Sequence, residues 1–235
     1  MNAAALYKAG RLDEAIEALG AGLRDNPTDA SARTFLFELL CFAGSFDRAE
    51  KQLDILARNG TEAEAGALLY RGALHADRIR QTMFEEGGLP VSAKDPEPVS
   101  GTINGQAFDA LEDADPRIGA RLELLVAGQY TWLPMEHVAS VTMEPPRRLR
   151  DLLWAPVVVR PSERMQELEL GEVLMPVLSP GAWRSPNDEV RLGRVTEVDD
   201  LADGRAVPVG QKLWLVDGQE LPLLEIRELT ITPRA

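Results

Sequence analysis

The sequence predicts an α+β protein in two parts. N-terminal helical hairpins precede a β-rich α+β domain, built as a curved sheet or a partly closed barrel with a packed helix. Residues 1–86 contain one proline, whereas residues 87–235 contain the other 15 and most of the valines. Near the same point the apolar spacing changes from a period of about 3.6 to one of about 2. We therefore expect a helical domain at 1–88, a linker at 89–100 and the β-rich domain at 101–235.

The helical half contains an internal repeat. Four residues recur 34 positions later, so that Gly10, Asp13, Ala15 and Leu19 return as Gly44, Asp47, Ala49 and Leu53. The glycines permit a tight turn after a first helix, the aspartates favour the positive end of a second helix, and the alanines allow close helix packing. This spacing resembles the tetratricopeptide repeat, whose period is 34 residues. A third helix, at 62–84, is expected to cap the stack.

A module of this kind binds a helix or an extended peptide in a groove lined by the first helix of each hairpin. By repeat alignment, the lining residues are Lys8, Thr34, Glu38, Cys41 and Phe42. The alternative is that this face packs only against the second half of the chain.

Tryptophans occur only in the second half. Trp132, Trp154 and Trp214 lie in apolar segments and are expected to pack in the core or at its edge. Trp183 lies in the Pro/Gly-rich loop SPGAWRSPND, where an exposed indole could anchor a protein partner.

The second half carries two strong hairpin signals, Asn104-Gly105 and Asp217-Gly218. The pair Asp115-Pro116 is typical of a helix start, and it predicts a helix over 117–127 that ends at Gly128. Seven to nine strands are expected in all. Those without a hairpin signal fall at 129–133, 138–143, 154–160, 171–178 and 194–198, with short helical turns at 149–154 and 185–192.

The charge and the cysteine content exclude several functions. The chain has 25 basic and 38 acidic residues, a net charge of −13, which argues against binding nucleic acid or anionic membranes. A single cysteine, Cys41, excludes an intramolecular disulfide and a cysteine-based zinc site. The chain has neither an apolar run of about 20 residues nor a secretory signal at its N-terminus, which favours a cytoplasmic location.

Catalytic signals are weak. The two histidines, His75 and His137, show no metal-ligand spacing, and no nucleophile elbow, Walker A or dinucleotide motif is present. We expect Cys41 to be a buried structural thiol. The densest acidic cluster comprises Asp109, Glu112, Asp113 and Asp115. We expect Asp113 and Asp115 to cap backbone turns, with ion pairs to Arg117 or Arg121. A hydrolase or metal-dependent enzyme using these carboxylates is the weakest alternative, so no metal or cofactor is predicted.

Four segments carry a more specific resemblance: FDALEDADPRIG, YTWLP, LRDLLWAP and LPLLEIREL. Together with the helical start, they resemble the ImpE/TagJ family, also called SciE-type virulence proteins, which are accessory components of bacterial type VI secretion. The residues that match the most specific segment are Asp113, Asp115, Arg117 and Gly119, and a structural role is expected for them.

The resemblance implies a non-enzymatic adaptor that links the contractile sheath to the ClpV-type AAA+ ATPase that disassembles it. The small subunit of the sheath is the implied direct partner, bound through a helix. A general tetratricopeptide-type scaffold with an unrelated client is the alternative.

Overall fold

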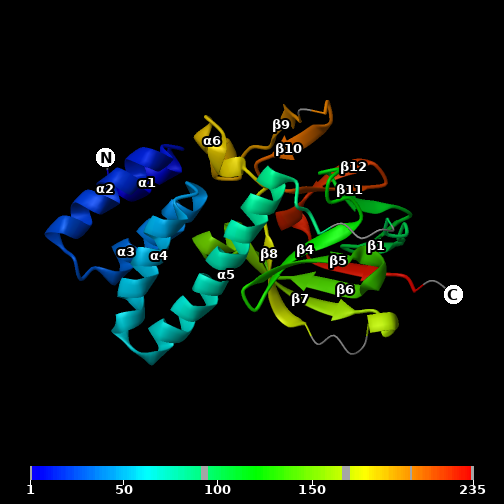
Figure 1. Cartoon of the computed structure of the whole chain (residues 1–235), viewed down its shortest axis with the longest axis horizontal. Helices are drawn as coiled ribbons and strands as arrows, with labels where there is room; N and C mark the ends of the chain where they lie inside the picture. Colours follow the sequence, from blue (N-terminus) through cyan, green and yellow to red (C-terminus); the bar gives the residue numbers. More distant parts are fainter. Residues whose placement is uncertain (1, 91–94, 166–169, 202, 234–235) are drawn as a thin grey trace.

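The computed structural model describes residues 2–90, 95–165, 170–201 and 203–233. Its N-terminal part is helical, as predicted, and lies to one side of a β-rich part (Figure 1). The longer helices are α1 (Ala3–Lys8), α2 (Leu12–Asp25), α3 (Ala30–Phe42), α4 (Phe46–Leu56) and α5 (Thr61–Glu86), and a 3₁₀ turn, η1 (Ala57–Asn59), joins the last two.

Helical spacing explains why these segments pack. In α2 the buried residues recur three or four positions apart, at Leu12, Ala15 (and Ile16), Leu19 and Leu23, which gives the helix one apolar face. Gly10 and Gly44 have φ angles of +69° and +65°, so the repeated glycines make the left-handed turns that join the helices of each hairpin.

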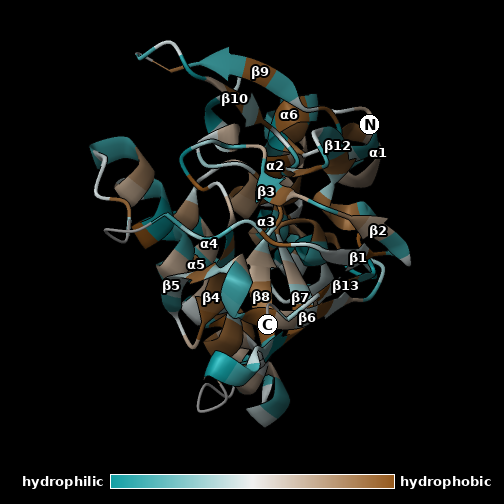
Figure 2. Cartoon of the chain, turned by 90° about the vertical axis from the view of Figure 1, so that its right-hand side faces the viewer, coloured by the Kyte–Doolittle hydropathy of each residue, from teal (hydrophilic) through white to brown (hydrophobic). Residues whose placement is uncertain are grey.

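The strands form three sheets in the described part of the chain. The largest has the order β2-β1-β13-β6-β7-β8-β4-β5 and is open, with β2 and β5 at its edges. A second sheet has the order β12-β11-β3, and β9 and β10 form a separate ribbon that projects from the body (Figure 2). The strands of the large sheet are β1 (Gly101–Ile103), β2 (Gln106–Phe108), β4 (Arg121–Val126), β5 (Gln129–Pro134), β6 (Val138–Met143), β7 (Trp154–Pro161), β8 (Gly171–Pro176) and β13 (Glu228–Ile231). The smaller sheets contain β3 (Leu111–Asp113), β9 (Glu197–Asp200), β10 (Ala206–Val209), β11 (Leu213–Val216) and β12 (Gln219–Pro222).

Short helical elements connect the strands. They are η2 (Met135–His137), η3 (Leu149–Leu152), η4 (Glu163–Met165), η5 (Ala182–Arg184), α6 (Asp188–Arg191) and η6 (Leu223–Glu225). The helical turns predicted at 149–154 and 185–192 are therefore present as η3 and α6, and the described strands outnumber the expected seven to nine because several are only three or four residues long.

The helix predicted over 117–127 is wrong, because most of that segment is strand β4. Leu122 and Leu124 pack into one core, whereas Glu123 and Leu125 face the helices on the other side of the sheet. A strand that is buried on both faces lacks the polar-apolar alternation that marks a half-exposed strand. Ala127 and Gly128, with φ of +50° and +81°, form the turn of a β4–β5 hairpin rather than a helix end.

The helical and β-rich parts share a hydrophobic core. The core of the helices continues into the second part through Leu125, Leu153, Trp154, Leu174 and Leu192. A second core lies between the large sheet and the small three-stranded sheet. Residues 91–94 of the expected linker lie outside the described residues, and Val99, near its end, is buried in the second core. The domain limits remain a prediction.

Candidate functional site

Three of the residues predicted to line the groove are covered by the second half of the chain. Glu38, Cys41 and Phe42 are all buried on α3. The Arg150 guanidinium of η3 donates to the Glu38 carboxylate at 3.2 Å, which ties η3 to this face of the helix. Burial raises the pKa of Glu38 and, more strongly, that of the Cys41 thiol. At these positions the chain's own second half already occupies the face that a partner would use.

Trp183 also contacts the helical part. It is half-buried, and its ring lies so close to Gly44 that a Cβ at that position would be 2.5 Å from Cδ2. Its indole N–H points toward the Gln81 side-chain oxygen at 3.4 Å. The loop tryptophan is thus packed against the repeat glycine, and only part of its surface is open to a partner.

An open groove remains at the outer end of the same face. It has a volume of about 410 Å³ and is lined by Tyr7, Phe35, Pro146, Arg148, Leu149 and Leu152. We call it the α1–α3 groove. The rings of Tyr7 and Phe35 meet edge-to-face at 5.7 Å. The predicted residues Lys8 and Thr34 are the chain neighbours of these two aromatics.

The one charged residue in the lining of this groove is basic. Arg148 is exposed and has no ion pair with any described residue, and Lys8 is exposed at the end of α1. The groove therefore offers an apolar, partly aromatic floor and cationic neighbours, which suits a segment with apolar side chains and carboxylates.

A buried charge network joins α5 to the sheets. The Arg80 guanidinium binds the Glu123 carboxylate with two hydrogen bonds, of 2.7 and 3.1 Å, and donates a third to the Leu178 carbonyl at 2.9 Å. The Lys212 ammonium bridges Glu123 and Asp113, with 2.6 Å to the latter. Each of these four residues is at most 3% exposed, so the network is sealed from water.

The pKa values of the two carboxylates in this network, Glu123 and Asp113, are shifted in opposite directions. Glu123 lies between Arg80 and Lys212, and their attraction outweighs the burial that would raise its pKa, so its pKa is lowered. Asp113 pairs with one of these two cations, Lys212, and is repelled by Glu123. The attraction of Lys212 does not offset its burial, which raises the pKa of Asp113 from 3.8 to about 6. Tyr130 donates from its hydroxyl to Glu123 at 2.5 Å, and its pKa is raised by burial and by that carboxylate.

The residues of the most specific sequence segment build the loop between β3 and β4. The Asp115 carboxylate accepts from the backbone N–H of Arg117 at 3.0 Å and pairs with its guanidinium at 2.5 Å. Gly119 has a φ of +60° and accepts at its carbonyl from Asp113 N–H at 2.8 Å. The loop in turn places the Asp113 carboxylate beside Lys212.

The four residues of the acidic cluster differ in burial. Asp113 and Asp115 are buried in the contacts above, whereas Asp109 and Glu112 are exposed. Within the described residues no group of three potential ligands is placed to hold a metal ion. None of the helices in the described ranges is both long and apolar enough to cross a lipid bilayer.

Comparison with known proteins decides the family. Residues 105–230 match the ImpE protein family, and residues 6–71 match the tetratricopeptide repeat. The chain belongs to the ImpE family. This ImpE-family chain is also 32% identical to the type VI secretion system accessory component TagJ of Pseudomonas aeruginosa, over 99% of this chain and 92% of that protein.

A solved structure shares the fold. The crystal structure of a Vibrio parahaemolyticus protein superposes with a TM-score of 0.85 at 25% identity, covering 99% of this chain and 98% of that one. The arrangement of the two parts in this ImpE-family chain is thus matched over nearly its whole length by an experimentally determined structure.

Sequence reasoning missed the buried network. Its one visible signal is Glu123, a carboxylate in the otherwise apolar run LELLV. A charge in such a run, read as a strand, would have required a buried cation. Arg80 and Lys212 lie 43 and 89 residues away along the chain, and nothing in their local sequence pairs them with Glu123.

Proposed function

We propose that this ImpE-family protein is a non-enzymatic accessory adaptor of a bacterial type VI secretion system, acting in the cytoplasm. The observation that carries the proposal is the 32% sequence identity to an accessory component of that system, over 99% of this chain. A tetratricopeptide-type N-terminus, which in general serves protein binding, supports an adaptor rather than a catalyst.

The direct partner in this proposal is the small subunit of the contractile sheath, which contributes a helix. The adaptor assists the handling of that subunit by the ClpV-type AAA+ ATPase. The α1–α3 groove is the surface for the helix because it is the part of the predicted face left open beside η3. Its apolar floor takes the apolar face of the helix, and Arg148 pairs with a carboxylate on it.

The second candidate is a general scaffold whose client is unrelated to the sheath. The same groove favours it, since the groove's chemistry specifies an amphipathic segment rather than one protein. The two candidates differ in one observable: only the first requires saturable binding of the sheath small subunit.

Calorimetric titration of the full chain with the sheath small subunit tests the proposal. Because the two parts share a core, substitutions are better than truncations for locating the site. Arg148→Glu is expected to weaken binding about tenfold or more, which corresponds to about 1.4 kcal/mol. Arg147→Glu is the matched control, because Arg147 is the adjacent arginine, is 78% exposed, and does not line the α1–α3 groove.

A second pair of variants tests the apolar floor. Leu149→Asp is expected to abolish binding, whereas Leu68→Asp, at a leucine that is 68% exposed on α5 and outside the groove, is expected to leave it unchanged. Thermal melts establish that each variant is folded. Absence of binding by the unmodified chain would remove the sheath subunit as the partner, and equal binding by all variants would remove the groove as the surface.

A further inference from the structure

The strand β5 forms an edge of the large sheet. Among the described strands it pairs with β4 alone, and Leu133 of β5 lies opposite Leu122 of β4. In an antiparallel ladder, residues that bond to the neighbouring strand alternate with residues whose main-chain groups point away from it. The Met135 N–H donates to the Ala120 carbonyl at 3.0 Å in the same ladder, and this bond fixes which residues of β5 point outward.

The outward main-chain groups of β5 belong to Tyr130 and Trp132. Counting back from Met135 by twos, Leu133 and Thr131 bond to β4, so the N–H and C=O groups of Tyr130 and Trp132 face away from it. In the part of the chain that the structure describes, no turn or loop carbonyl accepts from either N–H. An added strand would meet two donors and two acceptors there, at the spacing of a β-ladder.

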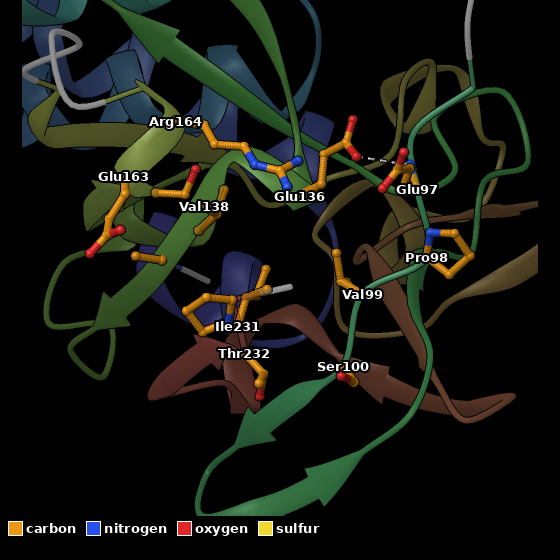
Figure 3. Close-up of a pocket in the computed structure, with 13 residues that line it drawn as sticks. Glu97, Pro98, Val99, Ser100, Glu136, Val138, Glu163, Arg164, Ile231 and Thr232 are labelled. Carbon is orange, nitrogen blue, oxygen red and sulfur yellow. Dashed lines mark hydrogen bonds between the residues drawn. The ribbon is translucent and has the colours of Figure 1, made fainter. Parts of the chain in front are cut away.

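The sequence of β5 lacks the features that usually protect an exposed edge. The strand reads QYTWLP, with no charged residue and no irregularity in its ladder with β4, and its proline, Pro134, comes last. Beyond Pro134 the Glu97 N–H donates to the Glu136 carboxylate at 3.3 Å, which holds the segment before β1 against η2 (Figure 3). The available part of the edge is therefore residues 129–132.

Helix α5 follows β5 along its length, and Figure 2 shows the two elements together at one side of the sheet. A Cβ on Gly72 would lie 3.4 Å from the Cα of Gly128, in the turn that begins β5. Twelve residues later along α5, the ring of Phe84 lies 6.2 Å from the ring of Trp132, measured between centroids. A strand added to β5 would therefore lie beside α5.

Two apolar side chains of α5 are available beside this edge. Ile79 and Met83 come seven and eleven positions after Gly72, so they share the helix face that meets the β4–β5 turn. Both are half-buried, and neither belongs to one of the two hydrophobic cores. Apolar side chains of an added strand could bury this surface, at about 25 cal/mol per Å².

The charge of the chain decides between possible occupants of the edge. The net charge is −13, so a second copy of the chain would be repelled, whereas a segment with lysine or arginine would be attracted. Because β5 itself is uncharged, the basic residues of such a segment meet no cation on the strand they pair with.

We propose that the edge of β5 binds an extended, basic segment of a partner polypeptide as an added antiparallel β-strand. The main chain of the segment pairs with Tyr130 and Trp132. Its apolar side chains, at every second position, pack on Ile79 and Met83, and its basic side chains lie on the other face. This edge lies outside the α1–α3 groove, so the proposal stands independently of the client of that groove.

Fluorescence anisotropy of a dye-labelled KVTVKV peptide, titrated with the full chain, tests the proposal. Residues opposite Tyr130 and Trp132 share their face of the sheet, so the valines face α5 and their N–H groups face β5. Saturable binding is expected to be at least about tenfold tighter than that of the acidic match EVTVEV, and than that of KVTVKV N-methylated at its valines.

A matched pair of variants locates the binding. Met83→Lys replaces apolar surface by a charge of the same sign as the peptide, and it is expected to weaken binding about tenfold or more. Thr82→Lys is the control, because it makes the same change of charge at the adjacent residue, which is exposed and lies on another face of α5. Melting curves show whether each variant is folded.

Amide hydrogen exchange gives a second readout. In the chain alone, the N–H groups of Tyr130 and Trp132 are expected to exchange faster than those of Thr131 and Leu133, and the peptide is expected to slow the first pair. Equal protection of all four without peptide would show that the edge is already covered. If that protection grows with chain concentration, the occupant is a second copy. Either result overturns the proposal, as does equal binding of the N-methylated peptide or no saturable binding at all.

Discussion

Replacement of Arg80 by methionine tests how the two parts of the chain are held together. Methionine keeps the apolar length of the side chain and removes the guanidinium. Among the described residues, the substitution leaves Glu123 paired with Lys212 alone, and it removes the donor to the Leu178 carbonyl. Arg80 is 1% exposed, so water cannot replace the lost contacts without opening the interface between α5 and the sheet.

The burial of Arg80 determines how much stability the substitution is expected to remove. Removal of one member of a buried ion pair generally destabilises a protein by about 3–5 kcal/mol, because the remaining charge is left uncompensated. For a chain of 150–250 residues, each kcal/mol lowers the melting temperature by about 2–4 °C. We therefore expect Arg80→Met to melt roughly 6–20 °C below the unmodified protein.

Urea denaturation at neutral pH, followed by tryptophan fluorescence, measures the decrease in the free energy of unfolding. The matched control is Arg78→Met on the same helix, where Arg78 pairs at 2.8 and 2.9 Å with Asp47 and Glu50, whose side chains are 90% and 41% exposed. A surface pair contributes about 0–1 kcal/mol, so the control is expected to be nearly neutral. If Arg80→Met costs no more than Arg78→Met, the buried network does not hold the two parts together.

Three further results are expected. The pKa of Asp113 is raised from 3.8 to about 6, so its protonation stabilises the folded state below about pH 4, and this contribution is lost as the pH rises through 6. In Asp113→Asn, urea denaturation should therefore show less loss of stability between about pH 4 and pH 7; an unchanged pH dependence would contradict this. Gly44→Ala should cost about 1–3 kcal/mol more than Gly87→Ala in the same assay, because both glycines have positive φ but only the first would meet the Trp183 ring. Burial raises the pKa of the Cys41 thiol well above its ordinary value, so a thiol reagent should react far faster in urea than with the native protein, and equal rates would show that Cys41 is exposed.

Much of the fold is readable from local signals. The repeated glycines at 10 and 44 specify turns because few other residues adopt positive φ, and both have positive φ in the structure. Asn104-Gly105 and Asp217-Gly218 likewise mark the β1–β2 and β11–β12 hairpins, with positive φ at all four positions. β4 could not be assigned in this way, because its partners on both faces are contributed by distant segments and its own apolar run fits a helix or a strand equally well.

The site was less accessible to sequence reasoning. Repeat alignment places Glu38, Cys41 and Phe42 on one face of α3, but it cannot show that η3, more than 100 residues later, covers Glu38 through Arg150. Lys8 and Thr34 are the chain neighbours of Tyr7 and Phe35, and neither lines the α1–α3 groove itself. Three of the predicted partner residues are thus used in contacts within the chain, and partner binding by the others stays a prediction.

Hydrogen–deuterium exchange of the full chain, with and without the sheath small subunit, tests the central claim most directly. The account predicts protection of backbone amides in α1, in α3 and in residues 146–152, with little change in the projecting ribbon of β9 and β10. Protection confined to the ribbon or to the outer strands of the sheet, with none in α1, α3 and 146–152, would contradict it.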